Sequence, residues 1–164
     1  MRSPYNVLFL CTGNSARSIM AEAIMNFRGK PNFVAYSAGS HPSMIIRPEA
    51  LHEIENAGMP TGDLRSKSWD EFSQPRAPKL DFVFTLCDDA AKRVCPVWPG
   101  HPATAHWGLA DPSAVRGTPE EKQDAFRQAF LILDRRIGLF LSLPHASLEE
   151  LSLQAKLREI GKSQ

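Results

Sequence analysis

The segment from Val7 to Met25 constrains the fold of this chain more than any other. Its first part, Val7 to Leu10, is an uninterrupted apolar run typical of a buried strand, and Ile19 to Met25 has the apolar content of a packed helix. Between them lie the eight residues from Cys11 to Ser18, which include one glycine. A strand that passes through a short loop into a helix predicts the first βα unit of a parallel sheet, with the loop at the carboxyl edge of the sheet.

The rest of the chain continues this alternation. Beside a first strand at 5–10 and a helix at 18–27, we expect strands at 33–38, 80–86 and 103–107, a helix at 48–57 and a short helical stretch at 68–72. A capping box from Thr118 to Glu121 predicts the start of a long amphipathic helix. The order indicates a single α/β domain over residues 1–143, with a parallel sheet and helices on both faces. A second capping box, which begins at Ser147, predicts a helical extension within 144–164.

The loop after the first strand has the residues of an oxyanion site. Backbone N–H groups of such a loop can form a nest for an anion, the helix N-terminus adds partial positive charge, and an arginine offers a bidentate fork. The same field should lower the pKa of Cys11 and make it a thiolate nucleophile. We expect Ser18 to donate a hydrogen bond to that thiolate. The expected oxyanion-binding residues are Thr12, Gly13, Asn14, Ser15, Ala16 and Arg17.

Each of these residues also has a plainer interpretation. Free cysteines are often buried, so Cys11 would then be a packing residue at the end of a strand. Arg17 would face solvent on the first helical turn, and Ser18 would be an ordinary hydroxyl at a helix N-terminus. The oxyanion hypothesis is favoured because strand, loop, arginine and hydroxyl all lie where the chemistry needs them.

The composition indicates no general class of binding partner, so the function must depend on a local site. The chain has 164 residues, 43% hydrophobic content and a formal charge of +1, which predicts one domain and no general attraction to nucleic acid or membranes. There is no apolar run near the ~20 residues of a membrane span, and the first strand begins too close to Met1 for a signal peptide. We therefore expect a cytoplasmic protein, in which three cysteines are reactive or buried thiols rather than a disulfide framework.

Asp111 is the candidate proton donor. When a thiolate displaces an oxygen from a tetrahedral oxyanion, the leaving oxygen needs a proton, and a carboxylic acid above the nest can supply it. The pair Asp111-Pro112 follows the expected strand at 103–107, at the same carboxyl edge as Cys11. Aspartate before proline is also common in turns, so the residues alone leave the two roles open.

Five segments together carry a resemblance to a known family. They run over 7–22, 36–39, 85–88, 95–96 and 106–112, and they include the string Cys-Thr-Gly-Asn-Ser-Ala-Arg-Ser and the string His-Trp-Gly-Leu-Ala-Asp-Pro. With these the chain resembles the arsenate reductases of the low-molecular-weight protein tyrosine phosphatase fold. The resemblance implies four parallel strands, Cys11 as nucleophile, Arg17 as anion ligand and Asp111 as general acid.

Two further cysteines separate a reductase from a phosphatase. A reductase needs a second thiol to attack sulfur and release arsenite. By resemblance Cys87 attacks Cys11, Cys95 then attacks Cys87, and thioredoxin, or glutaredoxin with a low-molecular-weight thiol, reduces the final disulfide. Phosphatases of this fold usually carry aromatic residues after the Asp-Pro pair, where this chain has Ser113 and Ala114. They also often have a second cysteine before the arginine, where this chain has Ala16.

Three interpretations stay open, and the arsenate reductase is the first. Cys87 and Cys95 can be inert packing residues, in which case the chain is a tyrosine or small-molecule phosphatase that uses Cys11, Arg17 and Asp111 alone. The third possibility is a non-catalytic oxyanion-binding regulatory module.

No metal or other cofactor is expected. Some thioredoxin-coupled members of the family bind potassium beside the anion loop through an Asn, a Glu, a Ser and an Asp. Asn14, Glu22 and Ser37 match three of these positions, and Lys67 stands at the fourth. We expect the Lys67 ammonium to supply the cation internally.

Overall fold

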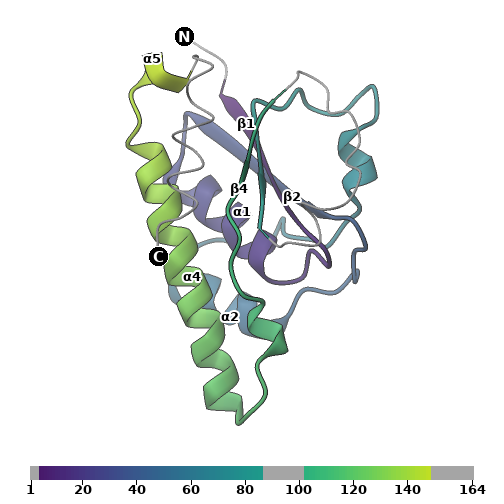
Figure 1. Cartoon of the computed structure of the whole chain (residues 1–164), viewed down its shortest axis with the longest axis vertical. Coiled ribbons are helices and arrows are strands. Elements are labelled where there is room, and N and C mark those ends of the chain that lie inside the picture. The colour runs from purple at the N-terminus through teal and green to yellow at the C-terminus, as the bar shows by residue number, and fades with distance from the viewer. Residues whose placement is uncertain (1–3, 87–101, 149–164) are drawn as a thin grey trace.

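The computed structural model describes residues 4–86 and 102–148, and a four-stranded parallel sheet lies at its centre (Figure 1). The strands are arranged in the order β2-β1-β3-β4, and all three neighbouring pairs are parallel. In the register of the sheet Cys11 is the partner of Gly39, so the last residues of β1 and β2 lie side by side. The parallel sheet predicted from the sequence is confirmed, with strands β1 (Tyr5–Cys11), β2 (Phe33–Gly39), β3 (Phe82–Thr85) and β4 (Ala103–His106).

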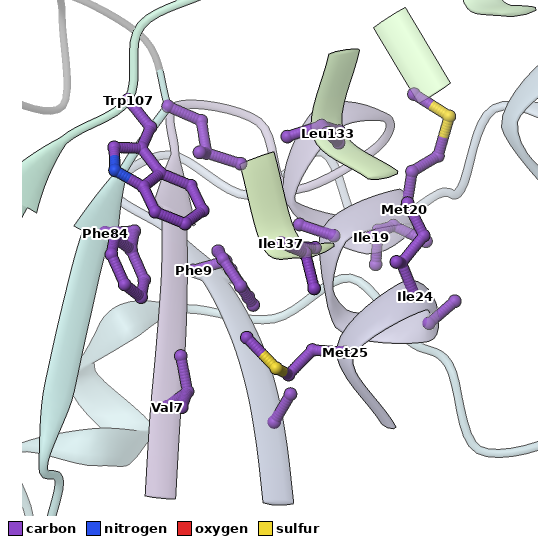
Figure 2. Packing of buried hydrophobic residues seen from close by; sticks show 14 of the residues in the cluster. Val7, Phe9, Ile19, Met20, Ile24, Met25, Phe84, Trp107, Leu133 and Ile137 are labelled. Atoms are coloured by element: carbon purple, nitrogen blue, oxygen red, sulfur yellow. The ribbon is translucent and has the colours of Figure 1, made fainter. Parts of the chain in front are cut away.

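The longer helices pack on one face of this sheet. Their buried side chains belong to the same hydrophobic cluster as Val7 and Phe9 of β1, and Figure 2 shows residues of two of them around Phe9. Among the described residues, the other face is covered by the short 3-10 helix η1, whose Phe72 packs with Leu8 and Leu10. The helices of the cluster are α1 (Arg17–Arg28), α2 (Pro48–Asn56) and α4 (Pro119–Leu141), and η1 spans Trp69–Phe72.

Several ends of elements follow directly from local sequence signals. The helix α4 begins with the predicted capping box: the Thr118 side chain accepts from the Glu121 N–H, and the Glu121 side chain accepts from the Thr118 N–H. The helix α2 begins with Pro48, whose fixed φ suits a first helical position. A short 3-10 helix, η2 (Pro112–Ala114), follows β4 and is capped by the side chain of Asp111.

Two elements differ from the sequence predictions by more than one residue at an end. The strand β3 covers only Phe82–Thr85, although the flanking Asp81 and Leu86 N–H groups still bond to the carbonyls of Asn6 and Leu10 of β1. The last described helix, α5 (His145–Leu148), starts before Ser147, which was predicted to cap it. The Ser147 N–H instead donates to the Pro144 carbonyl at 3.0 Å, so the turn begins at the proline.

The alternating side chains of β1 bury this strand on both faces. Val7 and Phe9 point toward the helices, and Leu8 and Leu10 point toward η1, with no exposed surface on any of the four. Burying one large apolar side chain contributes about 1.5–3 kcal/mol, so the position of β1 is strongly determined. The end of this strand is therefore a rigid support for Cys11.

No described helix is both long enough and apolar enough to cross a membrane.

Candidate functional site

The carbonyl groups of the loop between β1 and α1 are turned outward by hydrogen bonds from the segment 41–47. The carbonyls of Thr12, Gly13 and Ser15 accept hydrogen bonds from the backbone N–H groups of His41, Ser43 and Arg47, respectively, at 2.8–2.9 Å. A peptide's N–H points opposite to its carbonyl, so the N–H groups of residues 13, 14 and 16 turn toward the inside of the loop. The loop therefore presents donors to its own centre, which is the arrangement of an anion nest.

The helix that follows the loop adds to this field. Ala16 is the N-cap of α1 and provides no side-chain capping bond, and the first turn carries no acidic residue. The first N–H groups of a helix lack intrahelical partners and carry partial positive charge. An anion in the loop would satisfy donors that the chain itself leaves without a side-chain cap.

The side chain of Asn14 connects the loop to three neighbouring segments. It is fully buried and adopts a left-handed φ of 48°, a conformation that asparagine tolerates better than most residues. Its amide nitrogen donates to the hydroxyls of Ser18 at 2.7 Å and Ser37 at 3.0 Å, and its amide oxygen accepts from the Lys67 N–H at 2.8 Å. One side chain thus ties the loop to α1, to β2 and to the segment around Lys67.

These contacts favour Ser18 as the donor in its hydrogen bond with Cys11. The Cys11 sulfur lies 2.9 Å from the Ser18 hydroxyl oxygen. Because that oxygen already accepts from Asn14, the hydroxyl proton is available for the sulfur. A donated hydrogen bond stabilises a thiolate relative to a thiol. Cys11 is 3% exposed, as a packing residue would be, but a polar partner at its sulfur favours the nucleophile.

Arg17 joins the loop to Asp111. Its Nη1 donates to the Leu109 carbonyl at 3.0 Å, and its Nη2 lies 3.6 Å from Asp111 Oδ2. The other carboxylate oxygen of Asp111 accepts from the N–H and the hydroxyl of Ser113 at 2.9 and 2.8 Å. Asp111 Oδ1 is therefore held by its own loop, and Oδ2 is the oxygen directed toward Arg17.

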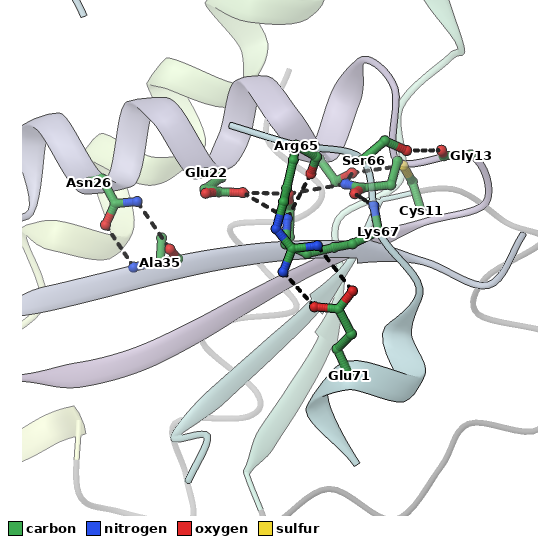
Figure 3. A network of polar contacts seen from close by, with 12 residues as sticks. Cys11, Gly13, Glu22, Asn26, Ala35, Arg65, Ser66, Lys67 and Glu71 are labelled. Carbon is green, nitrogen blue, oxygen red and sulfur yellow. Dashed lines mark hydrogen bonds and ion pairs between the residues drawn. The ribbon is translucent and has the colours of Figure 1, made fainter. Parts of the chain in front are cut away.

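A buried ion pair lies behind the loop (Figure 3). Glu22 accepts a hydrogen bond from Ser37 at 2.5 Å, and Lys67 Nζ lies 3.8 Å from Glu22 and donates to the Arg65 carbonyl at 2.8 Å. Burial raises the pKa of Glu22, an effect that Lys67 opposes. Burial lowers the pKa of Lys67, which Glu22 opposes. The structure thus brings together Asn14, Glu22, Ser37 and Lys67, the four residues that sequence comparison placed around a cation position.

Cys87 and Cys95 lie outside the described residues. The residue before Cys87 is described, and it is hydrogen-bonded to the end of β1: the Leu86 N–H donates to the Leu10 carbonyl at 2.8 Å. Leu10 and Leu86 immediately precede Cys11 and Cys87 in the sequence. Among the described residues, no three His, Cys, Asp or Glu side chains gather as a metal site would require.

The segment from His41 to Arg47 is a part of the site that sequence reasoning did not identify. It acts through backbone N–H groups, which every residue except proline carries, so residue type gives no signal. Its one local anomaly is Met44, a non-glycine residue with a φ of 67° whose N–H bonds to the Ser66 hydroxyl at 3.1 Å.

Comparisons with known proteins agree with this geometry. A model of the low molecular weight phosphotyrosine protein phosphatase family matches residues 6–154. An arsenate reductase of Oceanobacillus iheyensis is 37% identical over 134 residues, which cover 82% of this chain and 93% of that protein.

Solved structures show the same fold. An arsenate reductase in a phosphate-binding state superposes with a TM-score of 0.66 at 22% identity, over 84% of this chain and 97% of that one. A thioredoxin-dependent arsenate reductase of Corynebacterium glutamicum superposes with a TM-score of 0.54 at 26% identity, over 85% of this chain and 65% of that one.

The buried ion pair makes a prediction about stability. In Lys67→Met the Glu22 carboxylate loses its cation, its pKa in the folded state rises further, and the folded state binds the proton more tightly than the unfolded state. Stability relative to the unmutated protein must then fall as pH rises. We expect a loss of about 3 kcal/mol in the free energy of urea unfolding at pH ~8 and a clearly smaller loss at pH ~5.

Lys79→Met is the matched control, because Lys79 is exposed and forms no ion pair with any residue in 4–86 or 102–148. Its effect should be small and equal at both pH values. An equal loss at both pH values for Lys67→Met would show that the ion pair does not set the protonation of Glu22.

Proposed function

Because the chain belongs to the low molecular weight phosphotyrosine protein phosphatase family, we propose that it is an arsenate reductase that begins its reaction at the Cys11 thiolate. The observation that carries this proposal is the position of Cys11 beside the Ser18 hydroxyl at the start of an anion loop whose carbonyls are turned outward. Arsenate and phosphate share a tetrahedral shape and charge, so one cradle suits both anions.

The first step is a displacement at arsenic. The Cys11 thiolate attacks arsenate held by the loop N–H groups and Arg17, a sulfur–arsenic bond forms, and one arsenic–oxygen bond breaks. Asp111 donates the proton that lets the oxygen leave as water. Arg17 contacts the Leu109 carbonyl and lies near Asp111, so the residue that holds the anion also holds the loop of the proton donor.

The second stage transfers two electrons to arsenic. The Cys87 thiolate attacks the Cys11 sulfur, the electron pair of the sulfur–arsenic bond passes to arsenic, and arsenite leaves as a Cys11–Cys87 disulfide forms. Cys95 then attacks Cys87, which frees Cys11 and leaves a Cys87–Cys95 disulfide. Two thiols are oxidised for each arsenate reduced. The described contact between Leu86 and Leu10 supports this assignment, since the residues that follow them are Cys87 and Cys11.

The remaining disulfide needs an external reductant. We assign this role to thioredoxin, with glutaredoxin and a low-molecular-weight thiol as the alternative donor. The thioredoxin-dependent structural neighbour supports the first choice. Such reductants operate in the cytoplasm, which is the compartment we propose. The near-neutral charge gives no support to nucleic acid or membrane partners.

Phosphatase activity is the second candidate function. The family match favours it, since Cys11, Arg17 and Asp111 would serve equally for attack on a phosphate monoester. The residues after Asp111 argue against phosphotyrosine as the preferred substrate. Ser113 uses its side chain to hold Asp111, and no aromatic ring stands there to stack on a tyrosyl group.

A pair of cysteine variants separates the two stages of the reaction. Cys11→Ser should abolish both arsenate reduction and hydrolysis of p-nitrophenyl phosphate, because both begin at this thiolate. Cys87→Ser should abolish sustained arsenate reduction and retain hydrolysis of p-nitrophenyl phosphate. The measurement is arsenate-dependent NADPH oxidation with thioredoxin and its reductase, beside nitrophenol release without any thiol.

Arsenate turnover by Cys87→Ser at the unmutated rate would exclude the relay. Steady hydrolysis of p-nitrophenyl phosphate with no arsenate reduction by the unmutated protein would identify a phosphatase. Binding of phosphate without either activity would identify a regulatory module.

The Lys67 ammonium leads to a prediction about potassium. If it supplies the cation that relatives take from solution, the arsenate reductase activity of the unmutated protein should change equally with KCl and with NaCl at matched ionic strength. Lys67→Asp places a carboxylate beside Glu22, and its activity should rise with KCl more than with NaCl. Potassium-specific activation of the unmutated protein would contradict the proposed role of Lys67.

A further inference from the structure

Arg136 interrupts the apolar face of α4. It lies between Leu133 and Ile137, which both pack in the core, and it has no exposed surface. Figure 2 shows these two neighbours in the hydrophobic cluster that also contains Trp107 and Phe9. Burial lowers the pKa of Arg136, yet an arginine in a protein stays protonated, so a full charge is held in the core. A buried charge requires partners that satisfy it.

Its described partners are two consecutive peptide carbonyls. Arg136 Nη1 donates to Trp107 O at 2.9 Å and to Gly108 O at 3.1 Å. The same stretch is fixed from the sheet side, where the Trp107 N–H bonds to the Thr85 carbonyl at 2.7 Å. The chain that leaves β4 is thus clamped between α4 and β3.

The next peptide is held by a second arginine. Arg17 donates a hydrogen bond to the Leu109 carbonyl, and the Leu109 N–H donates to the Leu86 carbonyl at 3.1 Å. Asp111 follows two residues later, with Oδ2 at 3.6 Å from Arg17. Three consecutive carbonyls before Asp111 therefore point at guanidinium groups, and only that of Arg17 belongs to the anion site.

We propose that Arg136 is a positioning residue for Asp111: by holding the carbonyls of Trp107 and Gly108, it sets where the chain leaves β4 and hence where the Asp111 carboxyl stands relative to the bound oxyanion. The inference rests on the proposed function in one respect, the assignment of Asp111 as the proton donor. In this proposal Arg136 touches no substrate and acts on Asp111 through the loop that follows β4.

A double-mutant cycle tests the proposal. Arg136→Lys keeps the charge but replaces the planar fork with a single ammonium, so any loss reflects geometry rather than the electrostatic field. We expect it to lower kcat for arsenate about tenfold, because small displacements of a reacting group are costly. In an Asp111→Asn background, where kcat has already fallen about 100-fold, the same change should have almost no further effect.

Two measurements distinguish positioning from a general loss of structure. The inhibition constant for inorganic phosphate should stay within about twofold of the unmutated value in Arg136→Lys, because Arg17 and the anion loop are intact. The control is Arg127→Lys, an exposed arginine of the same helix whose partner is the exposed Asp124, and it should leave kcat unchanged. A tenfold loss in both backgrounds, or an equal loss in Arg127→Lys, would overturn the proposal.

Three further outcomes are also decisive. If the unmutated protein hydrolyses p-nitrophenyl phosphate but does not reduce arsenate, the proposed function fails. The double-mutant cycle is then measured with kcat for that hydrolysis. If the protein does neither, both proposals fail.

A second variant, Arg136→Gln, is made in parallel, because it keeps an N–H donor without the charge. Failure of both Arg136 variants to fold would assign this residue to stability alone and would overturn the positioning role.

Discussion

The outward rotation of the loop carbonyls is the constraint on which the site depends. Three backbone hydrogen bonds from the segment 41–47 hold the carbonyls of Thr12, Gly13 and Ser15 away from the loop centre. Without them the loop would present a mixture of donors and acceptors and would bind no anion well. Because the loop is held between a strand buried on both faces and a packed helix, the ordering cost of binding an anion should be small.

The parallel sheet then brings the other groups of the reaction to the same edge. Parallel strands place their carboxyl ends together, so the segments that follow β1 and β4 meet at one edge of the sheet. Arg17 connects these two segments directly, because its guanidinium contacts both the Leu109 carbonyl and Asp111. In the proposed mechanism this guanidinium links the anion loop to Asp111, the proposed proton donor. The side chain of Asn14 ties the same loop to α1 and β2.

The sequence predicts the parts of this structure that depend on side-chain pattern. The strand–loop–helix unit, the capping box at Thr118 and the contact between Cys11 and Ser18 could be predicted because each depends on a residue type at a fixed spacing. The backbone donors of 41–47 are not visible, since any residue supplies them. Arg136 carried a signal, a charge at a core position of an apolar helical face, but its partners are carbonyls far away in the chain, which no local pattern reveals.

The measurement that tests the central claim most directly is a single-turnover thiol count. The fully reduced protein, which has three cysteines, is mixed anaerobically with one equivalent of arsenate and no external thiol, and free thiols are counted after denaturation. A reductase that starts at Cys11 must release one arsenite and fall from three free thiols to one. Three free thiols with the arsenate unchanged would show that the anion nest and its thiolate serve some reaction other than reduction of arsenate.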